Sequence, residues 1–91
     1  MRLIMQIAVP TKEENPVVGM PDFENALTRV YLAAGAQSAY SDIVDGRRID
    51  IIVVEVDDLG QLTPTAKLVF DFLKVRPTFL PETAAKDHFG H

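Results

Sequence analysis

Cysteine is absent from this sequence, and no apolar stretch approaches the roughly 20 residues that a membrane-spanning helix needs. Without cysteine, the chain has no disulfide, no thiolate nucleophile and no Cys-based metal site. We therefore expect a cytoplasmic protein without a membrane-embedded segment. The first ten residues, MRLIMQIAVP, are mostly apolar, but no small-residue cleavage site follows them, so we interpret them as a strand and not as a targeting segment.

Positive charge is also scarce. Lys and Arg together number 9 against 13 Asp and Glu residues, and the formal net charge is −4. Because such a chain does not attract phosphate groups, nucleic acid and anionic membranes are disfavoured as partners. The sequence contains no phosphate-binding loop, no Ser-His-Asp arrangement and no zinc-ligand spacing, and we expect neither a metal nor an organic cofactor.

The most informative stretch is AYSDIVDGRRIDIIVVEVD, residues 39–57, which predicts a β-hairpin. Asp45-Gly46 is a strong signal for a two-residue turn, because both central residues of a type I′ turn need positive φ. The second arm, residues 49–56, is apolar at most positions on both of its faces. A strand of this kind needs cover on both sides of the sheet.

The other segments predict two helices and two further strands. In chain order we expect a strand at 2–9, a loop at 11–20, a helix from Pro21-Asp22 to Gly35, hairpin arms at 37–44 and 49–56, a helix beginning at Thr63-Pro64, a strand at 75–80 and a polar tail at 82–91. The helical spacing predicts two buried stripes: Phe23, Ala26, Leu27, Val30, Tyr31 and Ala34 in the first helix, and Leu62, Ala66, Val69, Phe70 and Leu73 in the second. Pro77 indicates that the last strand lies at an edge of the sheet.

The element order β-α-β-β-α-β is typical of the ferredoxin-like α+β sandwich, with an antiparallel sheet in the order 4-1-3-2. The first and third strands are the richest in apolar residues, as central strands should be. We therefore expect residues 1–91 to form a single ferredoxin-like domain.

Two helices cover only one face of such a sheet. A turn at Asp45-Gly46 would pair Asp42 with Ile49 and Tyr40 with Ile51 on the uncovered face. Because exposed apolar patches usually mark an interface, we expect a homodimer that packs these open faces together. A longer turn would move Tyr40 and Asp42 to the helix side, and the sequence leaves that alternative open.

In this setting the chain resembles the dimeric α+β barrel superfamily. The similar segments are MRLIMQIAVPT, AYSDIVDGRR and IIVVEVDDL, and they are most like a group of small uncharacterised bacterial proteins with this fold. More distant relatives include muconolactone isomerases, antibiotic-biosynthesis-type monooxygenases and stress-responsive A/B barrel proteins. The resemblance implies a dimer with a cleft between the sheets, but these motifs are structural and carry no catalytic signature.

The candidate site is the polar set on the predicted open face. Glu55 is the candidate general base, since an apolar cleft raises a carboxyl pKa, and Tyr40 is a candidate to orient a substrate oxygen. Gln6, Asp42, Ile51 and Val53 are the candidate ligand-binding residues. The alternative is that these polar groups only satisfy one another or pair with arginines across the dimer interface.

Three weaker features have structural explanations that we favour. Arg47, Arg48 and Arg76 are candidates for holding an anionic substrate, or else partners for nearby aspartates. His88 and His91, which lie near Asp87, suggest a metal site, but they are on a tail and no further suitably spaced ligand is evident. Asp57-Asp58 is more typical of a turn and helix cap than of a divalent-ion site.

Two functional classes remain. One is a cofactor-independent enzyme, similar to an isomerase or monooxygenase, that acts on a hydrophobic small molecule under a lid formed by residues 11–20. The other is a non-catalytic dimeric module that binds a small ligand or a protein. The open-face set contains no histidine, which favours the second class.

Overall fold

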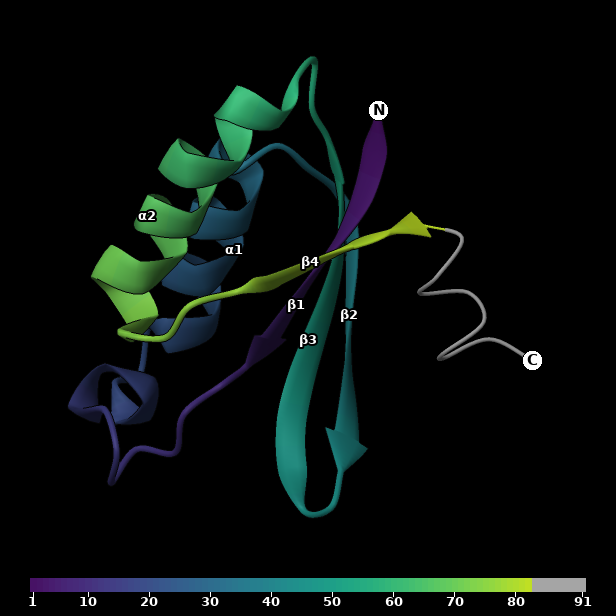
Figure 1. Ribbon diagram of the computed structural model, residues 1–91. Coiled ribbons are helices and arrows are strands. Elements are labelled where there is room, and N and C mark those ends of the chain that lie inside the picture. Colours follow the sequence, from purple (N-terminus) through teal and green to yellow (C-terminus); the bar gives the residue numbers. More distant parts are fainter. Residues whose placement is uncertain (83–91) are drawn as a thin grey trace.

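A computed structural model describes residues 1–82 and shows an α+β protein with one four-stranded antiparallel sheet. Its elements are β1 (Arg2–Ala8), α1 (Phe23–Ala33), β2 (Ala36–Val44), β3 (Arg47–Glu55), α2 (Leu62–Leu73) and β4 (Thr78–Pro81), with short 3-10 turns at Pro16–Gly19 and Leu59–Gln61. The strand order β2-β3-β1-β4 is the predicted 4-1-3-2 order seen from the other edge. Both helices lie on the same face of the sheet (Figure 1). The architecture is compatible with the ferredoxin-like fold.

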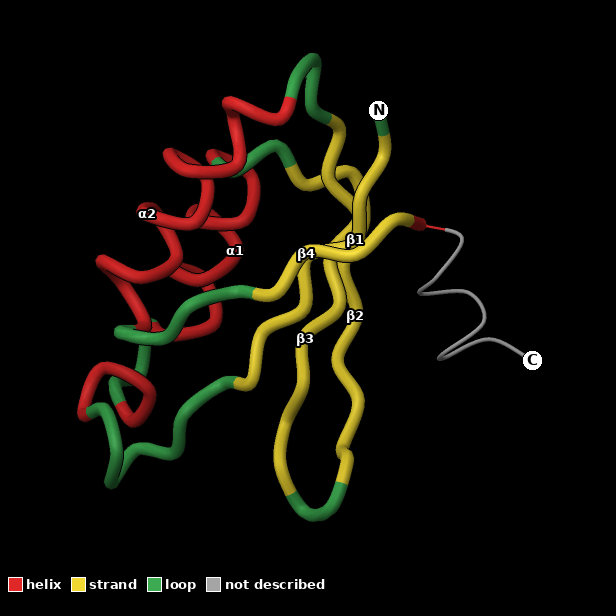
Figure 2. Tube along the Cα trace, viewed as in Figure 1, coloured by secondary structure: helices red, strands yellow, loops and turns green. Residues whose placement is uncertain are grey.

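The hairpin has the predicted turn and register. Asp45 and Gly46 both have positive φ, at 52° and 77°, as a type I′ turn requires. Tyr40 pairs with Ile51 and Asp42 with Ile49, so the longer turn is excluded. Figure 2 shows that this hairpin extends beyond the ends of α1 and α2.

The main core lies between the sheet and the two helices. Met5, Ile7, Ile52 and Val54 supply fully buried side chains from the central strands, and α1 and α2 add Leu27, Val69 and Leu73. Burying side chains of this size stabilises a fold by about 1.5–3 kcal/mol each. The predicted stripe of α1 is confirmed, since its residues are buried or half-buried.

The predicted stripe of α2 is wrong at one position. Phe70 is 41% exposed, whereas Thr65 is buried and Phe72 is packed against the core. Because successive residues are about 100° apart around a helix, Val69 and Leu73 define a stripe that Phe70 does not share. Phe72 instead stacks on Phe23 of α1, with a ring-centroid distance of 5.9 Å.

Among the predicted boundaries that differ, those of α2 and β4 have a clear local cause. α2 begins at Leu62, so Thr63 is not its N-cap. The Leu59–Gln61 turn instead runs directly into the helix. Asp58 caps that turn by accepting a 2.7 Å hydrogen bond from the Gly60 amide. β4 begins at Thr78, after Pro77, because proline has no N–H to donate to the ladder. β4 is nonetheless an edge strand, as predicted.

No helix within residues 1–82 is long and apolar enough to cross a membrane. Most of the predicted tail, including Asp87, His88 and His91, lies outside the described residues.

Candidate functional site

The sheet face opposite the helices is organised in rows by the strand register. The middle row consists of Tyr40, Ile51, Gln6 and Thr78. The row on one side of it, on the same face, consists of Ser38, Val53, Ile4 and Leu80. The row on its other side consists of Asp42, Ile49 and Ala8. The candidate ligand-binding residues therefore occupy three adjacent rows of one surface. We call this surface the open face.

The centre of the open face is apolar. Ile4 and Ile51 are buried, at 5% and 2% exposure, and Ile49, Val53 and Leu80 pack around them half-buried. Polar groups flank this centre: Gln6 is half-buried, and Tyr40 is 55% exposed. Small-molecule sites combine a mostly apolar lining with a few polar groups, and this face would need a second surface opposite it to form one.

Glu55 does not belong to the same part of the face. It lies at the end of β3 beside Arg2, four residues along the strand from the Tyr40–Ile51 row, which corresponds to about 13 Å. Its side chain is 44% exposed and lies 3.3 Å from the terminal amine of Met1. Within one chain, the structure therefore does not bring the two candidate catalytic residues together or enclose Glu55 in an apolar cleft.

The loop at 11–20 does not lie over the open face. Asn15 donates a 2.8 Å hydrogen bond to the carbonyl of Leu73 at the end of α2, and its side-chain oxygen accepts one from the Val17 amide. Val17 and Val18 pack against the core on the helix side. The prediction that this loop forms a lid is therefore wrong, because its contacts are with the other side of the sheet.

A polar cluster that sequence reasoning missed lies on the helix side. Asp50 is 2% exposed, and its carboxylate accepts hydrogen bonds from Tyr31 Oη and Ser41 Oγ, both at 2.6 Å. Arg48 adds two more, from Nε at 2.8 Å and from Nη2 at 3.2 Å. The cluster joins α1, β2 and β3.

Arg48 also connects this cluster to the start of α1. It donates to both carboxylate oxygens of Glu24, at 2.7 and 3.0 Å. Hydrogen bonds to Glu24 and then to Asp50 raise the pKa of Arg48, so its charge is permanent. Burial, followed by the hydrogen bond to Asp50, raises the pKa of Tyr31, so its phenol stays neutral.

The chemistry of the Asp50 cluster is structural. A cleft of about 160 Å³ beside it, between α1 and β2, is smaller than the roughly 300–1,000 Å³ of small-molecule sites. A neutral Tyr31 cannot act as a base, and the Asp50 carboxylate already accepts four hydrogen bonds from three residues. The cluster therefore holds the hairpin against α1.

Two of the three weakly favoured arginines have carboxylate partners. Arg47 pairs with Glu14 at 2.7 Å, and Arg48 with Asp50 and Glu24, as the structural alternative predicted in part. Asp58 is a cap. Within residues 1–82, no group of three or more His, Asp or Glu side chains is arranged to hold a metal ion.

These features define the chain's class: an α+β protein with two helices on one side of a four-stranded antiparallel sheet and an open, centrally apolar face on the other. Comparisons with protein-family models, curated proteins and solved structures give no match to it. The resemblance to dimeric α+β barrels therefore rests on the sequence segments and the topology alone.

Proposed function

We propose that this chain is a homodimeric binding protein that holds a hydrophobic small molecule between the open faces of its two copies. The observation that carries the proposal is the row pattern of the open face, in which an apolar centre at Ile4, Ile51 and Val53 is flanked by Gln6 and Tyr40. A second sheet would shield the apolar centre from water. The flanking polar groups would orient the bound molecule.

The dimer follows from how sheets bury their faces. Sheets stack about 10 Å apart, with side chains from both inner faces filling the space. Here both helices cover the opposite face (Figure 1), and Val53, Ile49 and Leu80 remain half-buried in the single chain. Pairing with a second copy removes the remaining apolar surface from water, at about 25 cal/mol for each Å².

A cofactor-independent isomerase or monooxygenase is the second candidate. It is favoured by the position of Glu55 and Tyr40 on the same face of the sheet. Because Glu55 is exposed in one chain, it would lie in an apolar cleft only if the second copy covered it. Binding needs no such additional step, so it is our first choice.

Native mass spectrometry of protein purified from its own host tests the proposal. We expect a dimer that carries additional ligand mass, and we expect Val53→Lys to lose both the dimer and the ligand. Ile43→Ser is the matched control, since Ile43 is 65% exposed on the other face of β2. Ligand mass on a monomer would contradict the shared site. Conversion of the retained ligand by the wild-type protein, but not by Glu55→Gln, would support the enzymatic function over simple binding.

A further inference from the structure

A second apolar site lies on the other side of the molecule, between α2 and the segment that leads into β4. This groove has a volume of about 480 Å³, within the range of small-molecule sites. Its apolar lining includes Leu62, Phe70, Pro77 and Phe79, and the cations Lys67 and Arg76 also line it. We call it the α2–β4 groove.

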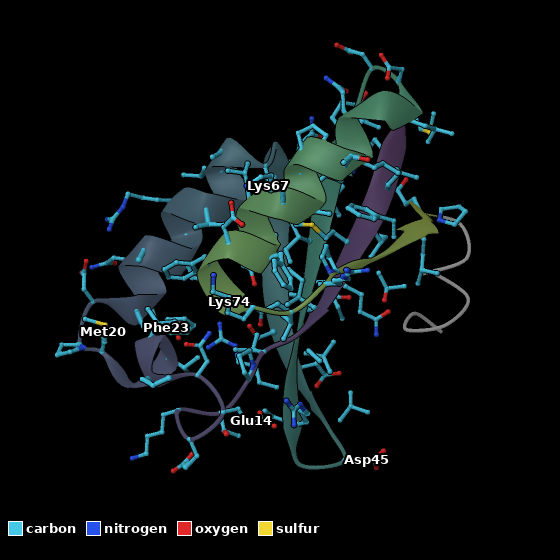
Figure 3. The ribbon with its side chains drawn as sticks, turned by 60° about the vertical axis from the view of Figure 1, so that its left-hand side comes forward. Glu14, Met20, Phe23, Asp45, Lys67 and Lys74 are labelled. Atoms are coloured by element: carbon cyan, nitrogen blue, oxygen red, sulfur yellow. The ribbon has the colours of Figure 1, made fainter. Side chains whose placement is uncertain are left out.

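One side of α2, which includes Lys67 and Phe70, forms a wall of the groove. Lys67, Phe70 and Lys74 are spaced three and four residues apart, so they lie along one side of the helix. Phe70 is 41% exposed, and the Lys74 ammonium lies 5.9 Å from the centre of its ring. Figure 3 shows Lys67 partway along α2 and Lys74 at its end. The core does not use this aromatic side chain, which leaves its ring available to a ligand.

The charges beside the groove are predominantly positive, in contrast to the chain's net charge of −4. Asp71 pairs with Lys67 at 2.7 Å, which leaves the charges of Lys74 and Arg76 beside the apolar lining. An apolar floor with cations at its margin is complementary to a ligand that has a flat apolar body and one negative group.

We propose that the α2–β4 groove binds a small aromatic carboxylate. The ring of the ligand packs against Phe70 and Phe79, and its carboxylate pairs with Arg76. This site is separate from the open face and does not depend on the function proposed for that face.

The probe is 2-naphthoate, and its neutral counterpart 2-naphthamide is the ligand control. In ¹H–¹⁵N spectra of the full chain, we expect 2-naphthoate to shift the amides of Lys67, Phe70 and Phe79 in a saturable manner. Arg76→Gln should weaken 2-naphthoate binding about fivefold, as for one partly exposed charge contact, and leave 2-naphthamide binding unchanged. Phe70→Ala should weaken both ligands. Lys12→Gln, which removes an exposed cation elsewhere, should change neither.

Three results would overturn the proposal. The first is no saturable shift at millimolar 2-naphthoate. The second is shifts confined to the open face around Gln6 and Thr78, which would place the ligand in the other site. The third is equal loss of 2-naphthoate affinity in Arg76→Gln and Lys12→Gln, which would show attraction to charge without a site. Arg76 and Phe70 are both exposed, so the variants should fold, and circular dichroism checks this.

Discussion

The replacement Asp50→Asn tests whether the buried cluster holds the hairpin to α1. Asparagine has nearly the same shape as aspartate but carries no charge, and one of its two polar atoms is a donor. Tyr31, Ser41 and Arg48 all donate to the Asp50 carboxylate. The substitution therefore removes the charge from each of these hydrogen bonds and sets a donor against a donor at one oxygen position.

The magnitude follows from the burial and from the partners that remain. Losing one member of a buried ion pair costs about 3–5 kcal/mol when the other charge is left unpaired. Arg48 is 29% exposed and keeps Glu24, so the lower end of this range applies. We expect a loss of about 3 kcal/mol in the free energy of unfolding, which for a chain of this size corresponds to a decrease of about 12–24 °C in Tm.

Urea unfolding followed by circular dichroism at pH 7 measures this loss. Asp57→Asn is the matched control, because Asp57 is exposed at the end of the sheet, and it should change the free energy of unfolding by less than about 0.5 kcal/mol. Ser41→Ala should cost about 1 kcal/mol, as for a single hydrogen bond. If Asp50→Asn were no more destabilising than Asp57→Asn, the cluster would not support the fold in the way described.

Two further predictions concern Tyr31 and Asn15. The pKa of Tyr31 is raised above its ordinary value of about 10, so above pH 10 the folded state retains a phenol proton that the unfolded state loses. The contribution of Tyr31 to the free energy of unfolding should therefore be fully present below pH 10 and decline above it. Tyr31→Phe should flatten this decline in urea midpoints measured from pH 8 to 11. Parallel curves for the two proteins would exclude Tyr31 as the titrating group. Asn15→Ala should cost about 1 kcal/mol and speed amide exchange at Val17 and Val18, and unchanged exchange would show that the bond to Leu73 does not hold the loop.

Much of the fold could be predicted from local patterns. The Asp45-Gly46 turn fixed the hairpin register, and with it the face on which Tyr40 and Asp42 lie. The element order and the composition of the strands then gave the sheet order. These features depend on φ preferences and on the two-residue period of strands, and both are readable from neighbouring residues.

The features that could not be predicted depend on contacts between distant segments. Asp50 lies two and four residues before Ile52 and Val54 on β3, and this spacing indicated that its side chain points to the helix side. Its partners Tyr31 and Ser41, however, come from two other elements. Phe70 was misplaced because α2 has apolar residues on more than one side, and only packing against α1 selects between them.

The loop and Glu55 show the same dependence on tertiary contacts. The bond from Asn15 to Leu73 spans 58 residues, so no local signal indicates that the loop lies on the helix side. The distance of Glu55 from the Tyr40 row follows from the strand register, but its exposure is a property of the single chain.

The central claim is that the open face joins two copies of the chain, and size-exclusion chromatography with light scattering at micromolar concentration tests it most directly. We predict a wild-type mass of about twice the 10.1 kDa of one chain. Val53→Lys should give the mass of one chain with its circular dichroism retained, and Ile43→Ser should remain a dimer. A wild-type protein with the mass of a single chain would contradict the claim.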